Sequence, residues 1–281
     1  MMIGGTMSKA DQTALPRSLL VLWGREEPRR RGPKPGLSLE RIAVAAISLA
    51  DADGLGAVSM GRVAGQLGVT TMALYRYVST KDELIALMLD VALGRPALPA
   101  DASEGWRARL ERWSWGYLMA LRRHPWAPRV PISGPPLTPN QVTWTEAWFG
   151  ALAATALTDQ EKLSVLLLVS NYVRGVAQLL IDLAAAERDA RPEQLSGMSP
   201  YGQLLAQVID AERFPTLCGM LASGAFDQPD DDPDEDFSFG LRTVLDGVAL
   251  LVRERQPTQK TPLMTPVNAQ NAQEEGDDGH H

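Results

Sequence analysis

Apolar residues in the first hundred positions recur at spacings of three and four, the pattern of helices that bury one face. The first predicted helix begins after Ser38, a residue type favoured at helix N-caps. It ends around Gly54, because glycine accepts the left-handed backbone found at helix C-caps. Its buried stripe consists of Leu39, Ile42, Ala46 and Leu49.

Two short helices are predicted next, over residues 59–67 and 70–77, with a tight turn at Gly68 between them. A fourth helix follows Thr80, which has capping-box spacing with a glutamate three residues later. Two short helices joined by a glycine turn are typical of a helix-turn-helix, whose second helix enters the DNA major groove. The bare pattern also fits an ordinary packed helical hairpin. We assign residues 38–94 to this N-terminal domain.

The rest of the chain predicts a larger, all-helical second domain over residues 95–255. The fold class is therefore all-α. The longest predicted helix is apolar almost all round, so it must be covered on every side, by its own domain or by a partner subunit. The expected helices lie near 103–123, 140–156, 158–187, 199–211, 214–224 and 236–254.

Composition excludes several classes of protein. The single cysteine, Cys218, rules out an internal disulfide and a Cys-based zinc site, and three histidines make a His-rich metal enzyme a poor fit. The most apolar run, Leu163–Ala186, contains Arg174 and Asp182, which argues against a membrane span. The amino end lacks the pattern of a signal peptide. We expect a cytoplasmic protein without a metal or cofactor.

Charge is unevenly distributed along the chain. The formal net charge is −7, but residues 1–90 carry 11 basic and 9 acidic side chains. Residues 29–34 hold four cations in six positions, and such a cluster binds phosphate locally because salt screens longer-range charge effects. We expect residues 1–37 to be a flexible extension carrying this basic arm, and residues 256–281 to be a disordered tail.

Residues 38–93 resemble the DNA-binding domain of the TetR family of bacterial repressors. The run Leu74-Tyr75-Arg76-Tyr77-Val78, followed by Lys81-Asp82-Glu83-Leu84, is specific to that family. The stretch from Trp106 to Arg255 resembles the helical regulatory domain of the tetracycline-repressor subgroup more loosely, in helix order and length.

The resemblance implies that the protein binds double-stranded DNA as a homodimer. On the exposed part of the second short helix, Arg76 is the only side chain that can read guanine with two hydrogen bonds, and Met72 and Ala73 can contact a thymine methyl. Gly61 departs from the family, because many relatives carry a larger residue there that reaches a base. The other expected contacts are Ser59, Met60, Arg62, Thr70, Thr71, Tyr75, Tyr77 and Lys81, with Arg30, Arg31 and Lys34 of the basic arm as candidate minor-groove contacts.

Six of the seven tryptophans fall between residues 106 and 148, where the family builds its effector cavity. Aromatic walls suit a flat or polycyclic apolar ligand, although for each residue plain core packing is the alternative. His124 could ligate a metal, but no matching carboxylate pattern accompanies it. The candidate lining is Trp113, Tyr117, His124, Trp126, Trp144, Trp148, Asn171, Tyr172 and Arg174.

These observations favour a ligand-responsive transcriptional repressor and no enzyme. An unknown small-molecule effector would bind the state of the dimer in which the two recognition helices do not match the spacing of the two half-sites on DNA. The fourth helix would couple the effector site to the DNA-binding domain. An activator or a ligand-independent DNA-binding protein is the alternative. A helical enzyme using the aromatic pocket would leave the Tyr75–Lys81 run and the basic arm unexplained.

Overall fold

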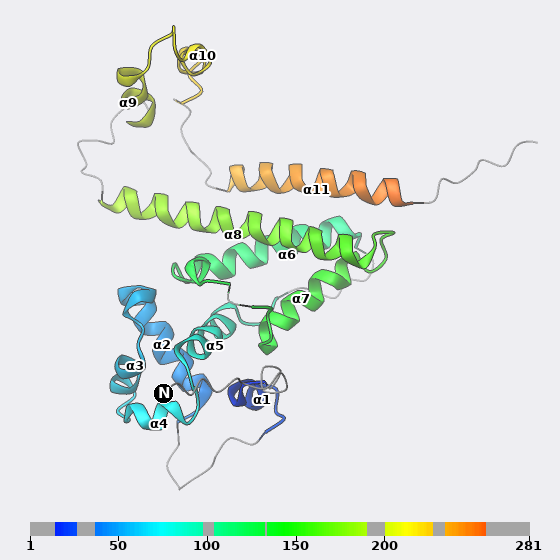
Figure 1. Ribbon diagram of the computed structural model, residues 1–281. Helices are drawn as coiled ribbons and strands as arrows, with labels where there is room; N and C mark the ends of the chain where they lie inside the picture. The colour runs from blue at the N-terminus through cyan, green and yellow to red at the C-terminus, as the bar shows by residue number, and fades with distance from the viewer. Residues whose placement is uncertain are drawn as a thin grey trace, which may run out of the picture.

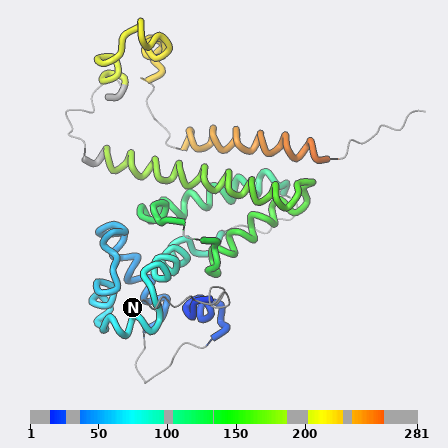
Figure 2. Tube along the Cα trace, in the orientation of Figure 1, coloured from blue at the N-terminus to red at the C-terminus, as the bar shows by residue number. Residues whose placement is uncertain are grey.

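The computed structural model describes residues 15–26, 37–97, 104–132, 134–189, 200–226 and 234–256. All regular structure in these ranges is helical, which confirms the predicted fold class (Figure 1). A smaller N-terminal group of helices lies at one end of a larger group. In the tube view, α8 and α11 run side by side along the outer edge of the larger group (Figure 2).

The N-terminal domain contains the predicted helices in the predicted order. They are α2 (Leu39–Asp53), α3 (Met60–Gln66), α4 (Thr71–Tyr75) and α5 (Lys81–Leu93), with a short 3-10 turn, η2 (Leu55–Ala57), after α2. Each α-helix begins where a Ser or Thr side chain accepts a hydrogen bond from the backbone N–H three residues later, which satisfies one of the free donors of the first turn. The four capping residues are Ser38, Ser59, Thr70 and Thr80.

Side chains from all four helices form the core of this domain. Ile42, Val63, Leu74, Leu84 and Met88 are fully buried, each from a position that the apolar spacing places inward. The recognition helix α4 is shorter than the predicted 70–77 segment.

The C-terminal domain follows the predicted boundaries to within a few residues, although the second helix ends four residues earlier than expected. It consists of α6 (Trp106–Arg122), η3 (Ala127–Arg129), α7 (Pro139–Leu152), α8 (Asp159–Asp189), α9 (Pro200–Val208), α10 (Pro215–Ala222) and α11 (Glu235–Arg255).

Helices α8 and α11 approach each other closely at Gly240. A Cβ there would lie 2.7 Å from Cζ of Tyr172, whose hydroxyl donates to the Phe237 carbonyl at 2.9 Å. At the other end of the pair, Arg255 bonds the Glu161 carboxylate at 2.7 Å. These contacts attach the last helix along one face of α8.

One part of the N-terminal extension, which includes most of the short apolar stretch at residues 19–23, forms a helix. Residues 17–22 form a helix, α1 (Arg17–Leu22), whose Val21 and Leu22 pack against the hydrophobic core. The basic arm with Arg30, Arg31 and Lys34 lies outside the described residues, as does the predicted tail from residue 257 onward.

Helix α8 is long and apolar enough to cross a membrane by length and composition, and 28% of its most apolar stretch is buried within the described part of the chain. Two of its charged residues bond other elements of the fold. Arg174 donates to the Val130 carbonyl, and Asp182 pairs with Arg129. These contacts mark α8 as the central helix of a packed domain with one face uncovered.

Candidate DNA-binding surface and effector site

The outward face of α4 and the start of α5 carry most of the exposed candidate DNA contacts. Met72 is 71% exposed and Tyr75 44% exposed, and Arg76 and Lys81 are also exposed. Leu74, between them in sequence, is fully buried and anchors α4 to the domain core. The helix therefore presents one face to solvent while its opposite face holds it in place. Thr71, Ala73 and Tyr77 are half-buried at the edge of this surface.

Two of the predicted DNA contacts have other partners. Met60 is only 7% exposed and packs in the core of the domain, so its prediction as a DNA contact is wrong. Arg62 bonds Asp53 at 2.5 Å and the Ala57 carbonyl at 3.4 Å, which directs its guanidinium toward the end of α2.

The position of Arg76 changes its expected role. It is the C-cap residue of α4, one position beyond the last helical residue. In a helix-turn-helix, the N-terminal residues of the recognition helix contact base edges. Thr71 and Met72 occupy that end here, whereas Arg76 lies at the opposite end. Met72 thus lies at the end of α4 that in a helix-turn-helix faces the bases, and it is exposed.

Four of the predicted effector-site residues form one aromatic cluster in the C-terminal domain. The Trp113 ring centroid lies 4.9 Å from that of Trp148, 5.6 Å from that of Trp144 and 5.0 Å from that of Tyr117. The two edge-on tryptophan contacts are favourable because a positive ring edge meets a negative ring face. Trp113 Nε1 donates to the Trp144 carbonyl at 2.9 Å.

Trp148 differs from its neighbours in the cluster. It is fully buried, yet its Nε1–H has no hydrogen-bond partner among the residues that the structure describes. An unpaired buried donor costs free energy, so such groups in native proteins call for an explanation.

A polar pair borders the same cluster. Burial raises the pKa of Tyr117, and the neighbouring Arg174, which hydrogen-bonds the hydroxyl, opposes that increase. Arg174 therefore contributes a positive charge beside the aromatic rings. Among the predicted effector residues of α8, Arg174 is the one whose side chain reaches the aromatic cluster.

The remaining predicted effector residues lie elsewhere. His124 Nδ1 and Trp126 Nε1 both bond the Asp51 carboxylate, at 2.9 Å and 2.7 Å, and so join the C-terminal domain to the end of α2. Tyr172 is bonded to α11, and Asn171 is exposed on α8. Among the described residues, no cluster of three or more His, Cys, Asp or Glu side chains could hold a metal ion.

The junction between the two domains contains a residue that sequence reasoning missed. Asp90 of α5 is 3% exposed, and its Oδ1 accepts hydrogen bonds from the backbone N–H groups of Asn140 and Gln141, at 2.9 and 3.1 Å. It thus caps the amino end of α7, whose own N-cap Thr138 makes no side-chain cap bond. The only sign of this role in the sequence was the position of Asp90, an acidic residue among the apolar residues of the helix now seen as α5.

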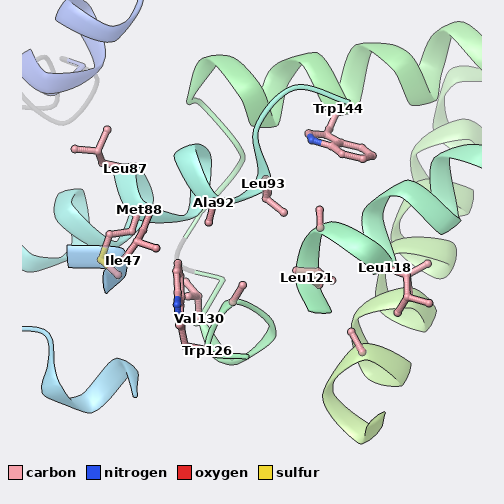
Figure 3. Packing of buried hydrophobic residues seen from close by; sticks show 14 of the residues in the cluster. Ile47, Leu87, Met88, Ala92, Leu93, Leu118, Leu121, Trp126, Val130 and Trp144 are labelled. Carbon is pink, nitrogen blue, oxygen red and sulfur yellow. The ribbon is translucent and has the colours of Figure 1, made fainter. Parts of the chain in front are cut away.

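Apolar packing completes this junction. In the close-up, the side chains of Leu93 of α5, Trp144 of α7 and Leu121 of α6 are drawn in the same part of the buried cluster (Figure 3). Trp144 Nε1 also donates to the Gly94 carbonyl, directly after α5, at 2.9 Å. Helix α5 is therefore attached both to the DNA-binding surface and to the aromatic cluster.

A surface groove of about 490 Å³ lies between the end of α7 and the start of α8. It includes none of the predicted effector residues. Its lining is Glu146, Phe149, Gly150, Ala153, Asp159, Lys162 and Leu163.

Helices α8 and α11 expose large apolar side chains along their length. The described residues of one chain leave these side chains uncovered, although their burial would be favourable. The exposed residues are Leu163, Leu167, Leu168, Leu179, Leu183, Phe239 and Leu250, between 45% and 63% exposed.

A helix-turn-helix domain attached to a helical domain with a buried aromatic cluster defines a class of ligand-responsive DNA-binding regulators. Residues 42–88 match the family model described as bacterial regulatory proteins, tetR family. Residues 98–252 match the model described as tetracyclin repressor-like, C-terminal domain. The chain belongs to the TetR family and is a transcriptional repressor of the ligand-responsive type.

Similar proteins agree with this assignment. The chain is 37% identical over 254 residues to the HTH-type transcriptional repressor DrrR1 of Streptomyces coeruleorubidus, covering 90% of this chain and 92% of that one. It is 24% identical over 260 residues to the repressor Rv1353c of Mycobacterium tuberculosis, covering 86% and 95%. The structure of the Streptomyces coelicolor TetR family protein ActR in complex with actinorhodin is similar with a TM-score of 0.65 and 25% identity, covering 79% and 99%.

Proposed function

We propose that the protein binds a near-palindromic operator as a homodimer, through α4 and the start of α5, and is released by an apolar polycyclic effector bound at the aromatic cluster. The exposed face of α4, with Met72 at its base-proximal end, is the observation that carries this proposal. Regulators of this kind generally act in the cytoplasm.

The proposed DNA contacts divide into two kinds. Met72 and Thr71 face the bases, where the methionine side chain fits a thymine methyl. Tyr75, Arg76 and Lys81 face the backbone, where cations position the protein without reading sequence.

The basic residues of the arm belong to the backbone-facing contacts in this proposal. Arg30, Arg31 and Lys34 are proposed as DNA contacts from the charge of the sequence alone, because four cations in six positions bind phosphate locally.

The proposed dimer forms through α8 and α11. Their exposed leucine and phenylalanine side chains supply the apolar surface that a stable interface buries. Two recognition helices are then available for two half-sites about 34–36 Å apart.

The effector proposal depends on the aromatic cluster. The unpaired Trp148 Nε1–H would donate to an oxygen of the ligand, and the Arg174 charge lies beside Tyr117 of the same cluster. Structural similarity to ActR, which was solved with actinorhodin, makes actinorhodin the first compound to test.

The DNA proposal is tested by selecting bound sequences from random duplexes and titrating the enriched sequence with two variants. Met72→Ala should change the selected base at one position per half-site, because it removes the thymine contact. Lys81→Ala should weaken all sequences alike and reduce the salt dependence. Failure of the wild-type protein to enrich a two-fold symmetric motif would contradict the proposal.

The effector proposal is tested with Trp148→Phe. Trp113→Phe is the contrasting variant, because both changes remove the same ring volume from the core and both lower thermal stability. The loss should be smaller for Trp148→Phe, whose Nε1 has no partner among the described residues, than for Trp113→Phe, which also breaks the bond to the Trp144 carbonyl. Trp148→Phe should in addition make actinorhodin less able to release DNA. Equal release by wild type and Trp148→Phe would contradict the placement of the ligand.

A further inference from the structure

The short helix α1 touches both domains, although it precedes the DNA-binding domain in sequence. Ser18 is 6% exposed, and its hydroxyl donates to Oε2 of Glu83 on α5 at 2.8 Å. At the other end, Trp23 Nε1 donates to the Leu137 carbonyl, just before α7, at 2.8 Å.

The first of these contacts lies at the amino end of α5. Glu83 Oε2 also accepts the backbone N–H of Ser79 at 3.1 Å, while the Glu83 N–H donates to Thr80. Ser18 therefore binds the same oxygen that completes the capping arrangement of α5. Lys81, a proposed phosphate contact, lies within this turn.

The second contact lies beside the amino end of α7, which Asp90 attaches directly to α5. Helix α5 and the start of α7 are thus joined twice. The direct connection runs through Asp90, and the second runs from Glu83 through α1 to Leu137. A six-residue helix is too short to persist alone in water, so these contacts and the packing of Val21 and Leu22 hold α1 in place.

We propose that α1 is an interdomain strap that keeps the amino end of α5 in a fixed relation to the loop before α7. The inference rests on the proposed function, because the end of α5 that it holds carries a proposed DNA contact. Movement of the segment around Leu137 would pull on Trp23 and loosen the turn that contains Lys81. Release of either end of the strap has the same consequence as release of both.

Two variants of the full chain test the strap. Trp23→Phe removes the indole donor and keeps an aromatic ring, and Ser18→Ala removes the hydroxyl. Arg25→Lys, an exposed position in the segment after α1 that keeps its charge, is the control. Circular dichroism would establish that all variants are folded.

The first measurement is hydrogen exchange without DNA. Trp23→Phe should accelerate exchange of the Ser79 amide at the far end of the strap, and Ser18→Ala should accelerate the Asn140 and Gln141 amides. Changes confined to the mutated end of α1 would overturn the proposal, because they would show two independent local contacts.

The second measurement is operator affinity. Each single variant should weaken binding by about two- to tenfold, the range expected for one net hydrogen bond, and the double variant should be no weaker than either single. Additive losses, or none, would overturn the strap. If wild type selects no operator, the proposed function fails, and the exchange experiment still decides the strap.

Discussion

Replacing Asp90 with alanine removes the side chain that caps α7 from α5. The carboxylate is buried and accepts two backbone hydrogen bonds, and Thr138, the N-cap residue of α7, makes no side-chain cap bond of its own. Asp90→Ala therefore leaves the Asn140 and Gln141 amides without their acceptor in a partly buried junction.

The expected loss follows from two known effects. Removing an N-cap side chain costs about 0.5–2 kcal/mol. A hydrogen bond to a charged group contributes about 1.5–3 kcal/mol, and a buried donor left unpaired adds a desolvation penalty. The cap and the charged hydrogen bonds are the same interaction, so the two values are not added. We expect Asp90→Ala to lower the free energy of unfolding by about 2–4 kcal/mol. Asp90→Asn keeps an acceptor of the same shape, so its loss should be about 1 kcal/mol.

Urea denaturation at a fixed protein concentration measures these losses, because a dimer's apparent stability depends on concentration. Asp159→Ala is the matched control. Asp159 is also in the first turn of a helix, but its side chain is 98% exposed, so its loss should be below about 1 kcal/mol. A loss for Asp90→Ala no larger than that of Asp159→Ala would refute the reasoning.

Two further predictions concern the α8–α11 pair. Gly240→Ala should lower the free energy of unfolding, because the added methyl group overpacks against Tyr172. Overpacking costs about 1–3 kcal/mol, which outweighs a helix-propensity gain of about 1 kcal/mol. In Gly247→Ala on the same helix the added methyl group meets open space, so this variant should not be destabilised. The pKa of Glu161 is lowered to about 2, first by the Arg255 hydrogen bond and then by the Thr158 backbone N–H. Its contribution to stability is therefore complete above about pH 4.5 and lost as the pH falls through 2. Glu161→Gln should be less stable than wild type at pH 7, and in urea titrations the difference should shrink steadily as the pH falls from about 4.5 toward 2.

The helices of this protein were predictable because the signals that define them are local. Capping needs a side chain and an amide three residues apart, and Ser38, Ser59, Thr70 and Thr80 all act as caps in the structure. Apolar periodicity likewise identified Leu39, Ile42 and Ala46 as buried residues of α2, because it depends only on helical geometry, whereas Leu49 of the same stripe is half-buried.

The sites were predicted less completely because their partners lie far apart in the chain. The sequence placed the tryptophans near an effector cavity, but the structure assigns Trp126 and His124 to Asp51, more than 70 residues away, and Trp113 and Trp148 to the cluster. Met60 is a further example. Its position at the start of α3 suggested a DNA contact, but packing within the domain core buries its side chain.

Spacing along the chain thus determined where helices begin, end and bury a face. The choice of partner for each polar or aromatic side chain came from the tertiary fold. Asp90 meets α7 fifty residues later, and Trp23 meets Leu137 across 114 residues. Such contacts have no periodicity or fixed spacing, because they depend on how whole helices pack against one another.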